Sequence, residues 1–129
     1  MFIPHKTDDG RIPPIEYLPC GAITPKLGLA LIQSGGNLAI ASGTTKPTYL
    51  CMTERSAAVT AGTIIPVQRV SEDLIYETTS SAAFTGVKQG AKVTLATDGL
   101  RVTATTTDGV AEVVEIADTA AGGKVYVRF

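Results

Sequence analysis

The strongest constraint on the fold is an internal repeat. A shift of 62 positions aligns three segments of the first half with three of the second: 26–28 with 88–90, 36–40 with 98–102 and 44–45 with 106–107. A shift that is shorter by two residues then aligns 60–67 with 120–127. Identities are few, but glycines, turns and apolar positions keep their register. We interpret this pattern as the duplication of a small β unit, with pseudo-repeats at about 24–70 and 86–129.

The duplication makes specific predictions about equivalent positions. If both copies fold alike, three pairs of residues match: Gly28 with Gly90 and Asn37 with Gly99 at turns, and Val67 with Val127 at inward-facing strand positions.

Alternation of apolar and polar residues with a period of two runs through both copies. In the second copy, Val93 and Leu95 face one side of a predicted strand, and Lys92 and Thr94 face the other. Turn sequences such as 34–37 separate these strands, because Gly and Asn tolerate positive φ. No window of 11 residues supports an amphipathic helix. The sequence therefore predicts an all-β protein.

Length and composition limit the classes of function. The chain of 129 residues fits one domain, and its few aromatic side chains favour association as a way to enlarge the core. The net charge of −1, with no basic stripe, argues against nucleic-acid binding. No apolar run approaches the ~20 residues of a membrane helix. Without an evident secretion signal, Cys20 and Cys51 are predicted to be free thiols, and assembly is expected in a reducing cytoplasm.

Residues 1–22 differ from the rest of the chain. They hold four of the seven prolines and several apolar residues that a free linker does not need. Since Pro13-Pro14 favours an extended path, we expect an extended, Pro-rich N-terminal arm before a single β domain at 23–129. The arm would lie against its own barrel, a neighbouring subunit or a larger partner; a frayed end is the alternative for 1–10. Six residues are its candidate partner-binding anchors: Phe2, Ile3, Ile12, Ile15, Tyr17 and Leu18.

Residues that support catalysis or metal binding are scarce. His5 is the only histidine and has no evident partner for acid–base chemistry or for a metal site. Glu112 and Glu115 are three positions apart on a predicted strand, which places them on opposite faces. The acidic pairs at 8–9 and 72–73 lack the oxygen-rich spacing of a calcium loop. We therefore expect no catalytic, cofactor or metal site, and we expect that the protein is not an enzyme.

Several segments together resemble a known family. Residues 21–31, 43–49 and 59–67, followed by 93–105 and 122–129, look like parts of small capsid decoration proteins of tailed phages and prophages, also called head-fibre or cement proteins. The likeness is one of pattern and covers about residues 15–129. It implies a compact β-clip-like barrel, often trimeric, that sits on the capsid and reinforces contacts between shell subunits. It also implies that an N-terminal arm becomes ordered on the shell.

Three function classes follow from these observations. The leading hypothesis is a non-enzymatic virion structural protein that binds the major capsid protein as a homo-oligomer, with a trimer favoured, after synthesis in the host cytoplasm. A tail or baseplate component is the first alternative. The second is a small-ligand or carbohydrate-binding β module, whose aromatic platform would have to come from four tyrosines: Tyr17, Tyr49, Tyr76 and Tyr126. A β-barrel enzyme would need an acid–base pair that the chain does not offer.

Overall fold

The computed structural model describes all residues 1–129 and contains ten strands and no helix, which confirms the predicted all-β class. The strands are β1 (Ile3–Thr7), β2 (Ile15–Cys20), β3 (Ala30–Ser34), β4 (Asn37–Ile40), β5 (Tyr49–Cys51), β6 (Thr63–Arg69), β7 (Leu74–Thr79), β8 (Lys92–Val93), β9 (Ala111–Ile116) and β10 (Lys124–Arg128).

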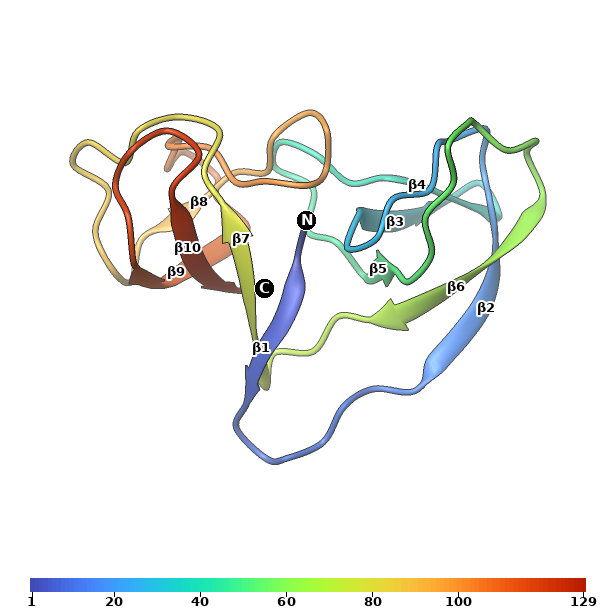
Figure 1. Cartoon of the computed structure of the whole chain (residues 1–129), viewed down its shortest axis with the longest axis horizontal. Helices are drawn as coiled ribbons and strands as arrows, with labels where there is room; N and C mark the ends of the chain where they lie inside the picture. Colours follow the sequence, from blue (N-terminus) through green and yellow to red (C-terminus); the bar gives the residue numbers. More distant parts are fainter.

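The strands are divided between two units that lie side by side, where one compact barrel was expected (Figure 1). In unit 1, residues 15–70, the strands close into a ring in the order β2-β4-β3-β5-β6. In unit 2, residues 74–129, the strands β7-β10-β9-β8 form a sheet to which β1 is added at the edge of β7. Isolated bridges from Val102 to Ser80 and to Leu95 connect the two ends of this sheet, as β4 does in unit 1.

The strand registers show the duplication directly. Three residue pairs of unit 1 recur in unit 2: Leu31–Tyr49 as Val93–Ala111, Cys51–Val67 as Val113–Val127, and Tyr17–Pro66 as Glu77–Tyr126. The last of these pairs involves β2 and β7. The repeats therefore begin at β2 and β7, earlier than the boundaries at 24 and 86 predicted from sequence.

Two of the three predicted equivalences are confirmed. Gly28 donates its N–H to the carbonyl of Cys51 at 2.8 Å, and Gly90 donates to that of Val113 at 2.7 Å. Both glycines have positive φ, at 70° and 87°. Val67 and Val127, the pair predicted to face inward, are both fully buried.

The predicted equivalence of Asn37 and Gly99 is wrong. Leu38 pairs with Gln33 in unit 1, whereas Val102 pairs with Leu95 in unit 2, so the second hairpin is longer by two residues. The additional residues contact unit 1, because the carbonyl of Gly99 accepts the N–H of Ala30 at 2.8 Å. The longer hairpin thus helps to hold the two units together.

Residues 1–22 do not form a separate arm. β1 pairs antiparallel with β7, and β2 pairs along its whole length with β6. This segment was expected to lie against its own barrel, a neighbouring subunit or a larger partner. It lies in the sheets of its own chain, where its side chains pack beside those of the paired strands. Residue 22 is therefore not a structural boundary.

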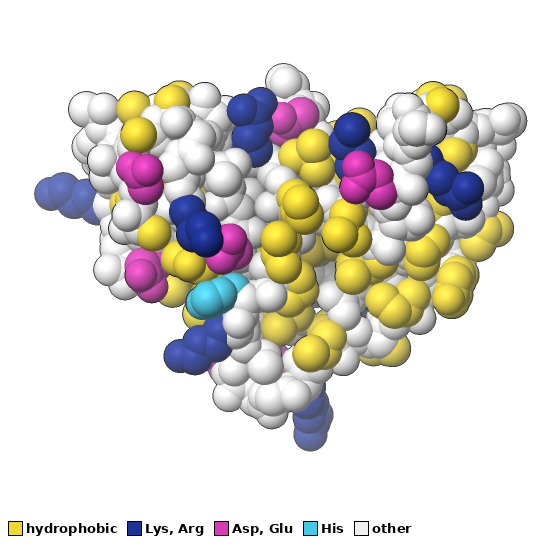
Figure 2. Space-filling model, in the orientation of Figure 1, with side chains coloured by type: hydrophobic (Ala, Val, Ile, Leu, Met, Phe, Trp, Pro, Cys, Tyr) yellow, Lys and Arg dark blue, Asp and Glu magenta, His cyan; other side chains and the backbone are white.

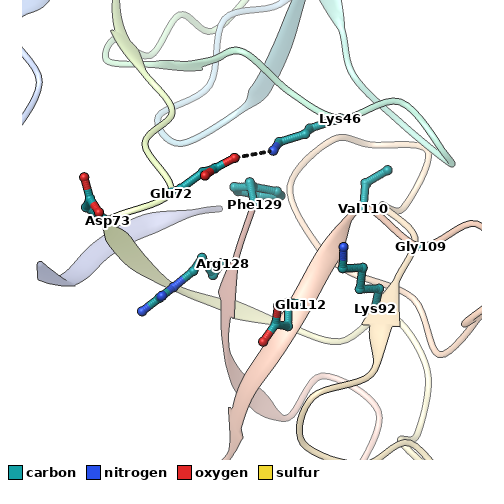
Figure 3. A pocket seen from close by; sticks show the side chains of 9 residues that line it. All are labelled: Lys46, Glu72, Asp73, Lys92, Gly109, Val110, Glu112, Arg128 and Phe129. Carbon is teal, nitrogen blue, oxygen red and sulfur yellow. Dashed lines mark hydrogen bonds and ion pairs between the residues drawn. The ribbon is translucent and has the colours of Figure 1, made fainter. Parts of the chain in front are cut away.

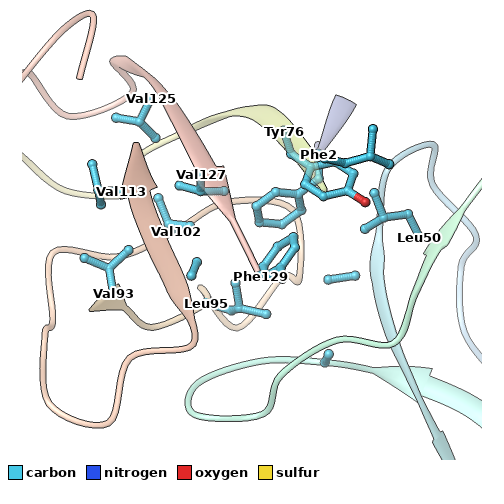
Figure 4. Packing of buried hydrophobic residues seen from close by; sticks show 14 of the residues in the cluster. Phe2, Leu50, Tyr76, Val93, Leu95, Val102, Val113, Val125, Val127 and Phe129 are labelled. Carbon is cyan, nitrogen blue, oxygen red and sulfur yellow. The ribbon is translucent and has the colours of Figure 1, made fainter. Parts of the chain in front are cut away.

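The two units share the larger of two hydrophobic cores (Figure 4). This core joins Ala30 and Leu50 of unit 1 to Tyr76 and Phe129 of unit 2, and Phe2 lies among them. The smaller core fills the ring of unit 1 and includes Cys20 and Cys51, which are free thiols as expected. Because one core spans both units, the chain behaves as one body.

Candidate docking surface

The outer face of the ribbon formed by β2 and β6 carries an exposed apolar surface. Side chains alternate along both strands, so five of them point away from the ring: Ile15, Tyr17 and Pro19 of β2, and Ile64 and Pro66 of β6. Tyr17 is 69% exposed, Ile64 56% and Ile15 44%. We call these five residues the β2–β6 face. Figure 2 shows hydrophobic side chains gathered on the side of the molecule where β2 and β6 lie.

Unit 2 provides an internal control for this surface. The positions equivalent to Tyr17 and Ile64 hold Glu77 and Lys124, which form an ion pair of 3.0 Å. The ring of His5 lies 4.4 Å from that of Tyr126, the counterpart of Pro66. The same strand pair thus carries an ion pair at the two positions that are most exposed on the β2–β6 face of unit 1. The fold therefore does not require apolar side chains at these two positions, and an exposed apolar surface of this kind is typical of a contact site.

The edge of β2 is also open. β4 pairs with β2 only through Leu38 and Cys20, so the part from Ile15 to Leu18 has no neighbour on that side. The equivalent edge of β7 is covered by β1. An exposed apolar face and an unpaired edge therefore occur on the same strand.

The six anchors predicted from sequence lie in different environments. Phe2 is buried in the larger core and has no surface available for a partner. Ile3 is half exposed on β1, and Ile12 is exposed in the connection between β1 and β2. Leu18 packs against the smaller core. Only two of the six belong to the β2–β6 face: Ile15 and Tyr17.

Sequence reasoning missed the contribution of β6 to this face. The adjacent residues Ile64 and Ile65 must point to opposite sides of a strand, so one of them has to face outward. Ile65 is the buried one, at 1% exposure. That doublet was the available signal, but the sequence did not show that β6 lies beside β2.

A charged cleft of about 520 Å³ lies where the two units meet (Figure 3). Its charged lining residues are of both signs: Lys46, Glu72, Asp73, Lys92, Glu112 and Arg128. Lys46 and Glu72 form an ion pair of 3.4 Å, and both side chains are well exposed. The cleft contains neither histidine nor cysteine, and its carboxylates have no arrangement that favours proton transfer. It is a weaker candidate site than the β2–β6 face.

The cysteines and the acidic side chains offer no further candidate site. Burial raises the pKa of both thiols, Cys20 and Cys51, which keeps them protonated and unreactive at neutral pH. No group of three or more His, Cys, Asp or Glu side chains is arranged to hold a metal ion. The structure has no helix that is long and apolar enough to span a membrane.

The tyrosines do not form an aromatic platform. Tyr49 and Tyr76 are buried at 6% and 1% exposure, whereas Tyr17 is on the opposite unit from Tyr126. A carbohydrate-binding surface of stacked rings is therefore not present.

Comparisons of the chain with protein families, with curated proteins and with solved structures gave no match.

Proposed function

We propose that this chain is a virion structural protein of a tailed phage or prophage that binds the major capsid protein and stabilises the capsid surface. The observation that carries the proposal is the apolar β2–β6 face, whose two most exposed side chains, Tyr17 and Ile64, are replaced by an ion pair in unit 2. A contact surface without catalytic groups fits a binding role rather than an enzymatic one. The resemblance to capsid decoration proteins supplies the identity of the partner, the site on the outer capsid surface and the β-clip-like description of the fold.

The size of the face supports binding as a homo-oligomer. Burying the exposed parts of Ile15, Tyr17 and Ile64 gives on the order of 1 kcal/mol per side chain. Association costs at least ~4 kcal/mol in lost freedom of motion, so one face alone binds weakly. A symmetric oligomer presents several faces to a symmetric shell and gains from the high effective concentration of the second and third contacts. A trimer, as in the family that the chain resembles, meets this requirement.

The test uses the polar face of unit 2 as a template. The double variant Tyr17→Glu/Ile64→Lys places on unit 1 the same charges that Glu77 and Lys124 carry on unit 2. Wild-type protein is expected to co-sediment with empty shells assembled from the proposed partner, the major capsid protein, and the double variant is expected to lose this binding. Deletion of residues 1–20 is unsuitable because it removes β1 and β2 from the two sheets.

The matched control is Ile3→Ser. Ile3 is as exposed as Ile15, at 44%, but lies on β1 beside unit 2. The control protein should bind shells like wild type. Absence of shell binding by the wild type would overturn the proposal, and binding to purified tail or baseplate instead would support that alternative.

A further inference from the structure

The unpaired edge of β2 presents free backbone groups at known positions. Met52 donates its N–H to the carbonyl of Pro66 at 2.9 Å, so Pro66 bonds towards β5. Residues of an antiparallel strand bond alternately to one neighbour and to the other. Tyr17, which pairs with Pro66, therefore directs its N–H and C=O away from β6, and so does Ile15. Gly21 obeys the same alternation, since its N–H reaches the carbonyl of Leu38 on that side at 2.8 Å.

β1 shows how such an edge is filled in this fold. On β7, β1 runs antiparallel and places Ile3 opposite Glu77 and Lys6 opposite Ile75. Glu77 and Ile75 are equivalent to Tyr17 and Ile15, because both strands pair with the last strand of their unit in the same register. The strand that covers β7 thus defines the register for a strand on β2. The presence of β1 also explains why Ile75 is more buried than its equivalent: Ile75 is 9% exposed, against 44% for Ile15.

No strand within residues 1–129 is left to occupy the β2 edge. β1 already pairs with β7, and Phe129 at the end of β10 lies in the larger core. Every other strand also belongs to one of the two units.

A second copy fits the edge poorly. Antiparallel self-pairing with Ile15 opposite Tyr17 places Glu16 opposite Glu16, which is unfavourable for like charges. The other register, with Tyr17 opposite Tyr17, places Ile15 opposite Pro19, which has no N–H to donate. Pro14 and Pro19 also limit the available edge to a short stretch, which prevents extended association between copies.

From this geometry we infer that β2 receives an extended segment of the capsid partner as an additional antiparallel strand, in the register that β1 adopts on β7. The segment carries apolar side chains at the two positions opposite Tyr17 and Ile15, because its outer face there continues the β2–β6 face. Main-chain hydrogen bonds contribute to the affinity for this segment, and the apolar side chains contribute to the specificity. The inference rests on the proposed function for the identity of the partner.

Residue-resolved hydrogen exchange of the full chain, with and without the empty shells, tests the added strand. In the free protein the amides of Ile15 and Tyr17 exchange fast, whereas those of Glu16 and Leu18 are protected by β6. With shells, exchange at Ile15 and Tyr17 should slow by about tenfold or more. Shell binding without this slowing overturns the inference but leaves the proposed function standing. If exchange at these two amides slows with rising protein concentration in the absence of shells, the edge pairs with a second copy, and the inference is again overturned.

A matched pair of variants separates the edge from the face. Ile15→Pro and Ile15→Ala both replace the isoleucine side chain by a smaller apolar one, but only the proline removes the N–H. Proline is tolerated at the first residue of a strand. The proline variant should bind shells at least about tenfold more weakly than the alanine variant, as expected for a lost hydrogen bond at a buried interface. Equal binding by the two variants, with equal thermal stability, contradicts strand addition.

A hydrogen-exchange experiment with a short peptide tests the β2 edge without shells. The capped peptide Phe-Ile-Pro-His-Val-Thr copies residues 2–7 with the change Lys6→Val, which places apolar side chains opposite both Tyr17 and Ile15. At millimolar concentration it should slow exchange at these two amides. If the wild-type protein does not bind shells, the proposed function is overturned. If the peptide also leaves the exchange rates of both amides unchanged, the edge is not a strand acceptor and the inference is overturned.

Discussion

Phe2 and Phe129 pack edge to face with their ring centroids 5.2 Å apart, so the residue before β1 contacts the residue after β10 inside the larger core. Phe2 also donates its N–H to the carbonyl of Gly28 in unit 1 at 3.0 Å. This one residue therefore connects a turn of unit 1 with the final strand of unit 2. Its position shows that the N-terminal segment holds the two units together.

Removal of the Phe2 side chain should destabilise the whole chain. Phe2 is 1% exposed, and truncation of a buried Phe to Ala costs about 3–5 kcal/mol. We expect Phe2→Ala to lower the free energy of unfolding by this amount in a urea titration. Ile3→Ala, at the neighbouring exposed position, should cost less than about 1 kcal/mol. Similar losses in both variants would contradict the role of Phe2.

The two equivalent glycines should differ in their tolerance of a side chain. A Cβ at Gly28 would lie 2.5 Å from the backbone oxygen of Phe2, whereas a Cβ at Gly90 meets nothing within 4 Å. Positive φ alone costs alanine about 1–2 kcal/mol at either position. Thermal unfolding of Gly28→Ala should therefore show a clearly larger loss of stability than that of Gly90→Ala. A larger effect at Gly90 would mean that Phe2 does not pack against Gly28 in solution.

The polar variant Tyr17→Glu/Ile64→Lys should fold as well as wild type. The same pair of charges exists on unit 2 as an ion pair that is partly exposed, and such pairs contribute little to stability. Its free energy of unfolding, measured by guanidinium titration, should match that of wild type to within about 0.5 kcal/mol. A large destabilisation would show that the apolar face serves the fold and would weaken the argument for a partner.

The stability of the chain should fall in alkaline solution. Burial raises the pKa of Cys51 above its ordinary value of 9.0, so the folded state holds this proton more tightly than the unfolded chain does. The resulting stabilisation is complete below the unfolded pKa and is lost as the pH rises through the folded pKa. The free energy of unfolding, measured by urea titration at a series of pH values, should therefore decline above about pH 9.

The variant Cys51→Val provides the control for this pH dependence, because Val113 occupies the equivalent position of unit 2. Its decline should be smaller but not absent, since burial also raises the pKa of Tyr76. Identical pH profiles for wild type and variant would exclude Cys51 as a source of the effect.

Local patterns in the sequence were sufficient for the strand class and for the repeat, because both depend on neighbouring residues. Alternation identified most strands, and glycines at positive φ, such as Gly28 and Gly90, preserved the register of the two copies. The alignment failed at β2 and β7, where Tyr17 corresponds to Glu77. The two strands differ on both faces, since Leu18 corresponds to Thr78 as well, so the start of the repeat could not be recognised from the sequence.

Long-range pairing could not be predicted from the sequence. Prolines and spaced apolar residues in 1–22 indicate an extended segment that lies against something, but they do not identify its partner strands. β1 does not pair with β2, the next strand in the sequence, but with β7, which is about 70 residues away along the chain. The β2–β6 face likewise combines residues whose proximity depends on ring closure.

The pairing of β1 with β7 also determines the order in which the chain can fold as it is synthesised. The ring of unit 1 has all its strands once Arg69 has left the ribosome, because β2 to β6 need no later residue. β1 has no strand partner until Leu74–Thr79 have been added, and Phe2 lacks its aromatic contact until Phe129 has been added. Domains emerging from the ribosome fold as their residues become available. The ring of unit 1 can therefore close while β1, which precedes it in the sequence, is still without its partner strand.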